Sequence, residues 1–344
     1  EEALVVGEDS LTWCISQIRK KLRDTSTPRR YIQTAPTYGY KYVGPIAETL
    51  DEQHRGKESW LLSQTTAEWT PRGLVGRTHE LQTLRQWYDA ACVGHPRLIF
   101  LTGEPGIGKT ALVEAFRTQL TALPDPALIG YGQCIEHSGA GEAYMPILEA
   151  LNRLGRNAGG DQLKTILEKH APTWLLQLPA LVSTGELGRL QQKVREVSQE
   201  RMLREIVDAF EVFTKDYPLV LILEDLHWSD ASTLEFLAAL ARGREALRLL
   251  VLVSYRPEDA PESVLYSVQQ ELYKERRCVA LPLLGLSVPA IAEYLTSRFS
   301  LTEEPAQFAQ LLHHQTAGNP LFFTNVVNDL VAQQLITSQA GHWR

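Results

Sequence analysis

The chain has 344 residues, of which 44% are hydrophobic, and its formal net charge is -7. This length exceeds one typical domain core and allows two or three. No apolar run reaches the roughly 18 residues that a bilayer span needs, and no basic stretch followed by an apolar one opens the chain. We therefore expect neither a membrane segment nor a signal peptide. The four cysteines are widely spaced, which favours free thiols in a cytoplasmic protein over disulfides or zinc ligands.

A basic segment comes first. Residues 17–41 hold seven cations and one acid, so a polyanion is the partner that this segment suits. Asp9 or Ser10 can cap a helix whose apolar residues recur at helical spacing from Leu11 to Leu22. Residues 30–43 then indicate two strands with a turn near Pro36. Taken alone, these residues fit an ordinary cationic helix and hairpin as well as they fit DNA binding.

The same segment resembles the C-terminal half of an OmpR/PhoB-type winged-helix domain, a phosphorelay-type effector domain. The helix matches the recognition helix of that family, and residues 30–40 match its wing. The resemblance implies that residues 1–46 bind DNA, with the helix in the major groove and cations on phosphates. The family's first strands and first two helices have no counterpart here, so we expect a partial domain. The implied DNA contacts are Thr12, Trp13, Ser16, Gln17, Arg19, Lys20, Arg23, Arg30, Tyr38 and Tyr40.

Polar residues without periodicity occupy positions 47–72 and predict a linker. Over residues 73–283, short apolar runs alternate with helical patterns, which predicts an α/β fold with a parallel sheet buried on both faces. Strands are expected at Leu98–Thr102, Leu128–Gln133, Leu219–Leu223, Leu249–Ser254 and Cys278–Leu281. Helices are expected at Thr110–Leu120, Gln191–Phe213 and Ser232–Arg242, and after Leu283 only helical patterns remain.

A phosphate-binding loop follows the first of these strands. The run Gly103-Glu-Pro-Gly-Ile-Gly-Lys-Thr110 fits G-x-x-x-x-G-K-[ST], with a strand before it and a helix after it. A plain glycine turn fits less well, because it leaves the Lys-Thr pair unexplained. We expect Lys109 to reach the β- and γ-phosphates of ATP and Thr110 to bind Mg²⁺. The expected ATP contacts in this loop are Gly103, Glu104, Pro105, Gly106, Ile107, Gly108, Lys109, Thr110 and Ala111.

Two acids end the third expected strand, Leu219-Val-Leu-Ile-Leu-Glu224-Asp225. Ligands of parallel sheets bind at the carboxyl ends of the strands. Acids at that position can hold Mg²⁺ and orient a water for attack on the γ-phosphate. A strand that simply runs into a polar turn is the alternative, and the phosphate loop earlier in the chain weighs against it. Which acid serves the metal and which the water stays open at this point.

Residues 73–335 resemble the STAND class of AAA-related signalling ATPases, which have an Orc/AAA-like ATPase domain. Four segments carry the resemblance: Leu74–Leu81, the Glu224–Asp230 run, Ser254–Pro257 and Gly318–Phe322. Many relatives have two aspartates where this chain has Glu224-Asp225. The resemblance implies that Glu224 binds Mg²⁺ with Thr110, that Asp225 orients water and that Arg256 lies near the γ-phosphate. It places Val75, Gly76, Arg77 and Pro320 near the nucleotide base.

The STAND resemblance also implies a switch with slow ATP hydrolysis. ADP would hold a closed state and ATP an open, oligomerising one, with residues 284–344 as a truncated helical lid. Together with the winged helix, this predicts a cytoplasmic transcriptional regulator. One alternative is an ATPase signalling scaffold that binds proteins without DNA. A P-loop kinase is the other, and it has no evident use for Arg256 or for residues 318–320.

Overall fold

The structure is a computed structural model. The chain divides into two compact units, and each unit is described by itself. Unit 1 lies within residues 1–70 and unit 2 within residues 71–344. The described residues are 32–35, 39–42, 74–125, 127–135, 143–156, 159–182, five single positions between 185 and 194, 198–243, 247–257, 264–299, 301, 305–336, 338–339 and 342–343.

In unit 1 the described residues form a β-hairpin. Strands β1 (Ile32–Ala35) and β2 (Gly39–Tyr42) pair antiparallel, with Ile32 opposite Tyr42 and Ala35 opposite Gly39. The two strands predicted around Pro36 are therefore confirmed. The predicted basic helix lies outside the described residues, as do nine of the ten implied DNA contacts, Thr12, Trp13, Ser16, Gln17, Arg19, Lys20, Arg23, Arg30 and Tyr38. Tyr40, the tenth, lies in β2 opposite Thr34.

Unit 2 is built on a parallel five-stranded sheet of order β4-β5-β6-β3-β7. The α/β fold with a parallel sheet is thus confirmed. All five predicted strands are present, and none differs from its predicted bounds by more than one residue at an end. They are β3 (Arg97–Thr102), β4 (Leu128–Gln133), β5 (Leu219–Glu224), β6 (Leu249–Tyr255) and β7 (Cys278–Pro282).

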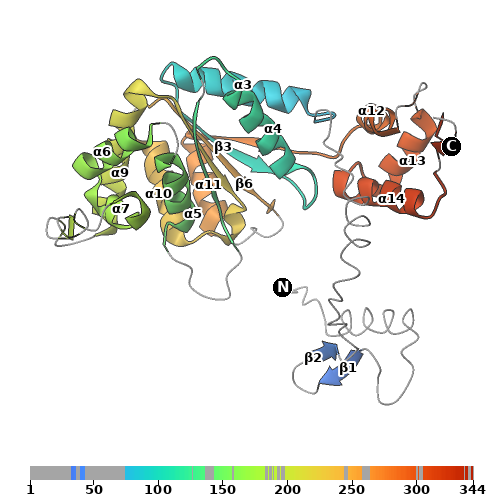
Figure 1. Ribbon diagram of the computed structural model, residues 1–344, viewed down its shortest axis with the longest axis horizontal. Coiled ribbons are helices and arrows are strands. Elements are labelled where there is room, and N and C mark those ends of the chain that lie inside the picture. The colour runs from blue at the N-terminus through green and yellow to red at the C-terminus, as the bar shows by residue number, and fades with distance from the viewer. Residues whose placement is uncertain are drawn as a thin grey trace, which may run out of the picture. The chain divides into compact units, whose positions relative to one another are not determined.

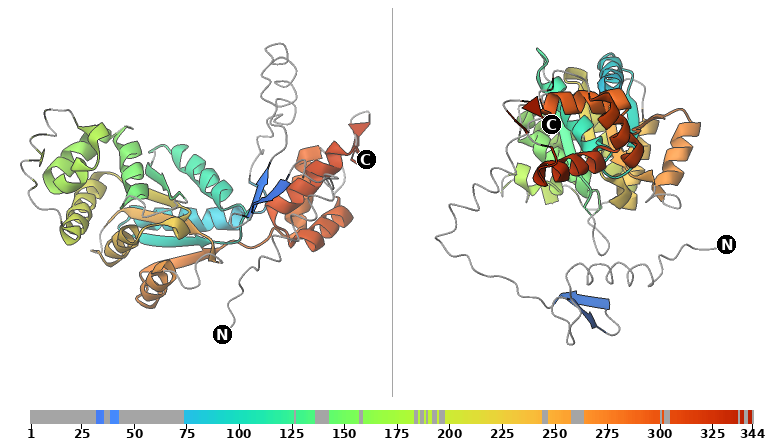
Figure 2. Two further views of the ribbon diagram at one scale, coloured as in Figure 1. Left: turned by 90° about the horizontal axis from the view of Figure 1, so that it is seen from below. Right: turned by 90° about the vertical axis from the view of Figure 1, so that its right-hand side faces the viewer.

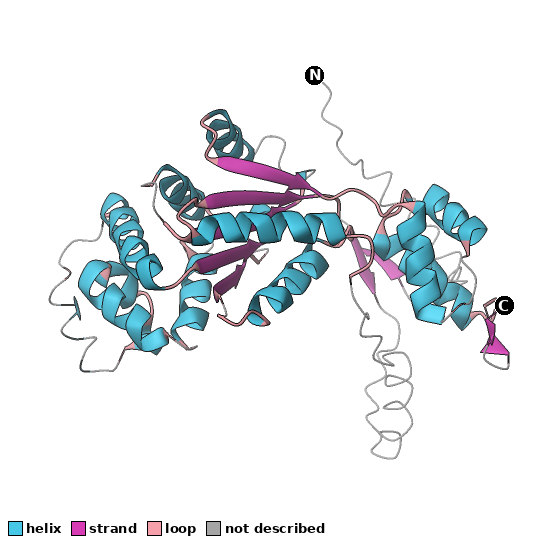
Figure 3. Ribbon diagram, turned by 90° about the horizontal axis from the view of Figure 1, so that it is seen from above, coloured by secondary structure: helices cyan, strands magenta, loops and turns pink. Residues whose placement is uncertain are grey.

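Helices cover both faces of this sheet (Figures 1, 2 and 3). Side chains of a strand point alternately to opposite faces, and β5 shows it: Leu221 packs in one core cluster and Ile222 in the other. Helices α3 (Thr78–Cys92) and α4 (Lys109–Thr121) cover the face of Ile222. The core cluster on the opposite face takes side chains from α5 (Met145–Gly155), α6 (Gly160–His170), α7 (Pro172–Leu176), α9 (Gln199–Asp216), α10 (Ala231–Arg242) and α11 (Val264–Lys274). Within it α6 packs on α5 and α9, and α7 packs on α6 and α9.

Two helix starts have clear local causes. The Ser198 side chain accepts a hydrogen bond from the Arg201 amide at 3.3 Å, so α9 begins at Gln199. The predicted start of this helix at Gln191 was therefore wrong. The carboxylate of Asp230 accepts from the Thr233 amide at 2.9 Å and caps α10. The last acid of the Glu224–Asp230 run is thus a helix cap.

A separate apolar cluster holds three further helices together, α12 (Val288–Phe299), α13 (Ala306–Thr316) and α14 (Pro320–Ala332). Figure 1 shows them grouped beside one another. The expectation that only helices follow Leu283 was wrong in one detail, because β8 (Ser338–Gln339) and β9 (His342–Trp343) form a short antiparallel pair. In the part of the chain that the structure describes, no helix has both the length and the apolar character needed to cross a bilayer.

Candidate functional site

The phosphate-loop sequence lies between β3 and α4, as predicted, and its glycines have the backbone angles that it requires. Gly106 has φ 76° and Gly108 has φ 101°, in the left-handed region that glycine enters without a steric penalty. Gly108 is also the residue that precedes α4. A helix N-terminus with a glycine-rich loop in front of it is an anion-binding arrangement, because several backbone N–H groups converge there.

Lys109 is held against the loop to which it belongs. Its ammonium group donates to the carbonyl oxygens of Gly103 at 2.6 Å and Glu104 at 3.0 Å. The residue is 8% exposed, and a buried charge of this kind is tolerated only with such partners. The cation is therefore already positioned over the loop.

The acid that ends β5 meets the first turn of α4. Thr110 donates its hydroxyl hydrogen to one oxygen of Glu224 at 2.7 Å, and Glu224 is 1% exposed. The sequence analysis assigned these two residues to one metal site, and the structure brings them together. A hydroxyl and a carboxylate are oxygen ligands of the type that Mg²⁺ prefers, so the pair could hold this ion.

A third residue, not predicted from the sequence, completes this cluster. Tyr131, on β4, donates its hydroxyl to the other oxygen of Glu224 at 2.8 Å. Two guanidinium groups lie over its ring, Arg117 at 4.9 Å and Arg153 at 4.8 Å from the ring centre. Burial, followed by the hydrogen bond to Glu224, raises the pKa of Tyr131. The phenol therefore stays protonated at neutral pH and remains a donor to the carboxylate.

Asp225, the second acid, has an unusual backbone. Its angles are φ 57° and ψ 43°, the left-handed conformation, which costs a residue with a side chain about 1–2 kcal/mol. Its backbone amide donates to the Ser254 hydroxyl at 3.2 Å. Its carboxylate accepts a hydrogen bond from the side-chain amide of Gln133 at 3.0 Å. These contacts from the neighbouring strands β4 and β6 hold the strained residue in place. Strain of this kind concentrates at functional positions.

Arg256 follows β6 directly, at the same edge of the sheet. Strand β6 lies between β3, which leads into the phosphate loop, and β5, which ends in Glu224. The Arg256 guanidinium lies 5.5 Å from the ring centre of Trp228, on the turn after Asp225. The arginine and the two acids thus all lie at the carboxyl ends of neighbouring strands.

The start of α14 is seated on the phosphate loop. The Asn319 side-chain amide donates to the Pro105 carbonyl at 3.0 Å, and the Leu321 amide donates to the Gly106 carbonyl at 3.2 Å. A Cβ atom on Gly106 would lie only 2.4 Å from the Leu321 Cβ, so the approach needs glycine. Asn319 also caps α14 and is 2% exposed. Pro320, which the sequence analysis placed near the base, is the first residue of this helix.

Arg77 joins the loop to the segment that leads into α12. Its guanidinium donates to the carbonyl oxygens of Ile107 at 3.0 Å and Leu284 at 2.7 Å, and it is 4% exposed. The two residues before it pack on the helical cluster: Val75 contacts its core, and a Cβ on Gly76 would meet Ala290 at 2.5 Å. The opening segment therefore bridges the loop and the α12–α14 cluster, and its arginine donors are used by protein carbonyls.

The fold and this edge of the sheet define a P-loop nucleoside-triphosphatase architecture. Residues 73–253, just over half of the chain, match the family described as the AAA ATPase domain. The chain belongs to this family and carries a nucleotide-binding ATPase domain of AAA type.

Individual proteins that resemble the chain differ from it considerably. An uncharacterized protein of Rhizobium meliloti (strain 1021) is 27% identical over 206 residues, which cover 55% of this chain and 19% of that protein. The chain thus spans about a fifth of this curated relative. The Orc1 protein of Aeropyrum pernix in complex with DNA matches 82% of this chain and 66% of its own, at 15% identity and a TM-score of 0.42. A STAND protein with a tetratricopeptide repeat sensor from Pyrococcus horikoshii matches 73% and 29%, at 18% identity and a TM-score of 0.40.

Proposed function

We propose that the chain is an ATP-controlled switch in a DNA-binding transcriptional regulator. The observation that carries the switch is the double hydrogen bond from the start of α14 to the carbonyls of Pro105 and Gly106. A ligand that moves the phosphate loop must also move this contact, because the same backbone serves both. Preferential binding to one arrangement then shifts the population between two states.

Each residue of the site has a role in this proposal. The loop amides and Lys109 bind the phosphates, and Thr110 with Glu224 would hold Mg²⁺, which supplies charge neutralisation between the phosphates. Asp225 would orient the attacking water, and Arg256 would contact the γ-phosphate from the end of β6. Arg77 and Asn319 then transmit the state of the loop to the α12–α14 lid, residues 284–344. Hydrolysis would be slow and would reset the switch to the ADP state.

Amide variants of the two acids test the catalytic part. We expect Glu224→Gln with Asp225→Asn to bind ATP but to lose hydrolysis, since an amide neither attracts a cation nor accepts a proton from water. Nucleotide affinity and phosphate release are measured on the same sample. The matched control is Glu211→Gln with Asp208→Asn on α9, away from the sheet edge. Hydrolysis at the wild-type rate in the double variant would contradict the assignment.

The DNA-binding part of the proposal rests on the basic segment and on the β1–β2 hairpin, which lies where a wing is expected. Replacing Arg19, Lys20 and Arg23 by Gln should lower the salt dependence of duplex binding by about 0.9 in slope for each lost phosphate contact. The matched control is Arg85→Gln on α3, an exposed arginine paired with Asp89. An unchanged slope would favour a scaffold that binds proteins.

A further inference from the structure

A cavity lies at the opposite end of the sheet from the phosphate loop. Its volume is about 500 Å³, and it is lined by the amino-terminal ends of β3, β6 and β7 together with the end of α10. The phosphate loop follows the carboxyl end of β3, so the two sites are separated by the length of that strand. A cavity of this size is within the range that small organic ligands occupy.

The floor of the cavity is apolar. Leu98, Leu240, Val251 and Cys278 line it, and each is no more than 8% exposed as a residue. Burial raises the pKa of the Cys278 thiol to about 11, so this sulfur is neutral at physiological pH and belongs to the apolar surface. The floor therefore suits a hydrocarbon or aromatic group.

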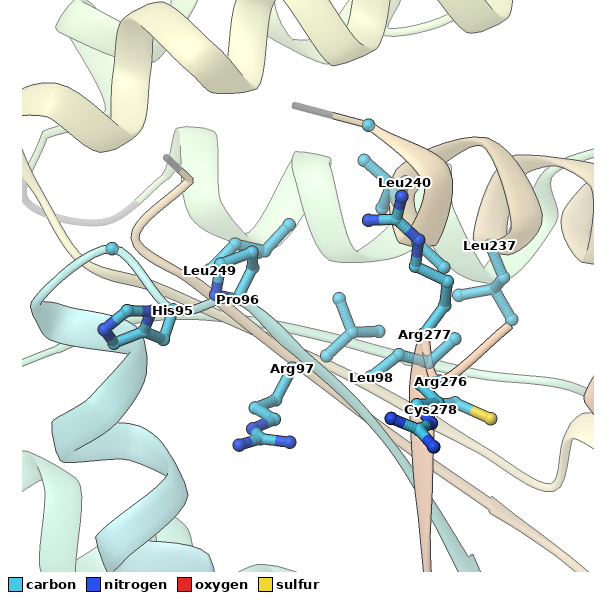
Figure 4. A pocket seen from close by; sticks show the side chains of 14 residues that line it. His95, Pro96, Arg97, Leu98, Leu237, Leu240, Leu249, Arg276, Arg277 and Cys278 are labelled. Atoms are coloured by element: carbon cyan, nitrogen blue, oxygen red, sulfur yellow. The ribbon is translucent and has the colours of Figure 1, made fainter. Parts of the chain in front are cut away.

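The rim is cationic. His95, Arg97, Arg276 and Arg277 are exposed and line the same cavity, and Figure 4 shows their side chains standing around the apolar floor. Among the described residues, no carboxylate lines the cavity and none forms an ion pair with these three arginines. Three arginines that line one cavity, with no carboxylate among its described lining residues, make a local positive potential on a chain of net charge -7.

Arg242 on α10, unlike the three arginines of the rim, forms ion pairs within the part of the chain that the structure describes. Its guanidinium lies 2.7 Å from Glu271 on α11 and 3.1 Å from Glu275, which follows the end of that helix. Those acids are therefore occupied by an arginine outside the cavity lining. The positive charge at the rim is left without a protein counter-charge in the described structure.

The backbone of Arg276 has an unfavourable conformation. Its φ is 58°, a left-handed conformation that a glycine or asparagine would adopt at lower cost. The backbone amides of Arg276 and Arg277 donate to the carbonyls of Tyr273 at 3.0 Å and Leu272 at 2.8 Å. These hydrogen bonds follow the end of α11 and precede the start of β7 at Cys278. Glycine would occupy this position after α11 with less backbone strain, yet the chain has an arginine there.

We propose that this cavity binds a small amphipathic anion, a molecule with an apolar body and one carboxylate or phosphate head. The apolar body fills the floor, and the arginines of the rim, Arg97, Arg276 and Arg277, supply guanidinium groups, which form paired hydrogen bonds to oxyanions. The volume of about 500 Å³ suits a small molecule. This site is independent of the nucleotide site.

Calorimetry on the whole chain tests the proposal with defined probes. Decanoate and decyl phosphate carry the two kinds of head, decanol carries none, and inorganic phosphate lacks the apolar body. We expect decanoate or decyl phosphate to bind at least about tenfold more tightly than decanol, as a charge-assisted hydrogen bond implies. The probe that binds more tightly, decanoate or decyl phosphate, shows whether the preferred head is a carboxylate or a phosphate. Inorganic phosphate should bind far more weakly than either, because it does not use the floor.

Three variants locate the binding. Arg276→Gly removes one guanidinium and relieves the backbone, so it should fold at least as well as the wild type and bind the anion about five- to tenfold more weakly. Arg277→Gln should have a similar effect, and Arg85→Gln, at an exposed ion pair on α3, should have none. Ala241→Phe fills the cavity from α10 and should abolish binding. Urea unfolding of each variant confirms that it is folded.

Four results would each overturn the proposal. Equal affinity for decanol and decanoate would leave no role for the arginines. Equal affinity for inorganic phosphate and decyl phosphate would leave no role for the floor. Absence of binding by both anions at about millimolar concentration, or unchanged binding in folded Arg276→Gly and Ala241→Phe, would place no such ligand in this cavity.

Discussion

Replacing Tyr131 by Phe removes one hydroxyl group and keeps the ring that Arg117 and Arg153 cover. The buried carboxylate of Glu224 then loses the 2.8 Å donor and keeps only Thr110, at 2.7 Å. A hydrogen bond to a charged group contributes about 1.5–3 kcal/mol to stability. Since Glu224 is 1% exposed, water replaces the lost donor poorly, and we expect the free energy of unfolding to fall by ~2 kcal/mol.

Urea unfolding at pH 7 measures this loss, and Tyr273→Phe is the control. Tyr273 is 60% exposed, so its variant should unfold within ~0.5 kcal/mol of the wild type. A double-mutant cycle of Tyr131→Phe with Glu224→Gln isolates the pair, and its coupling energy should exceed ~1 kcal/mol. An unchanged midpoint for Tyr131→Phe, or a coupling energy near zero, would refute the view that the phenol holds this carboxylate.

Two further predictions concern the contact between α14 and the phosphate loop. Asn319→Ala should destabilise the protein by ~1–2 kcal/mol. Asn319→Asp keeps the cap of α14 but replaces the donor to Pro105 by a carboxylate oxygen that the Pro105 carbonyl repels, so hydrogen exchange of α14 should separate the cap from the contact with the loop. Faster exchange in Asn319→Ala alone would mean that only the cap matters. Gly106→Ala should cost more stability than Gly108→Ala, because a Cβ on Gly106 meets Leu321 at 2.4 Å and one on Gly108 meets no atom within 4 Å. Equal losses, measured by urea unfolding, would show that backbone strain is the whole effect.

The sheet was predictable because its strands are buried on both faces. Such strands are short continuous apolar runs with sharp ends, and Leu219–Leu223 is typical. Helices α5, α6 and α7 were missed, since short amphipathic runs between β4 and α9 do not distinguish helix from other structure by periodicity alone. Their assignment depends on packing around a residue such as Trp174 of α7, which is fully buried in the core cluster.

The candidate site likewise contains residues that the sequence predicts and residues that it does not. The positions of Lys109, Thr110 and Glu224 could be predicted because they follow from the loop sequence and from the strand ends. Tyr131 could not, since its contact with Glu224 exists only because β4 pairs with β5 in this sheet order. The bridge from Asn319 to Pro105 joins residues 214 positions apart. Its backbone-carbonyl acceptor leaves no trace in the sequence.

The central claim is that the loop from Gly103 to Thr110 captures a triphosphate with the help of Lys109. Calorimetric titration of the chain with Mg-ATP tests it most directly, alongside Lys109→Ala and the control Lys215→Ala, an exposed lysine at the end of α9. We predict saturable binding by the wild type and by Lys215→Ala, and a loss of at least about a hundredfold in affinity for Lys109→Ala. The claim would be contradicted by no heat of association for the folded wild type at millimolar nucleotide, or by equal affinity in all three proteins.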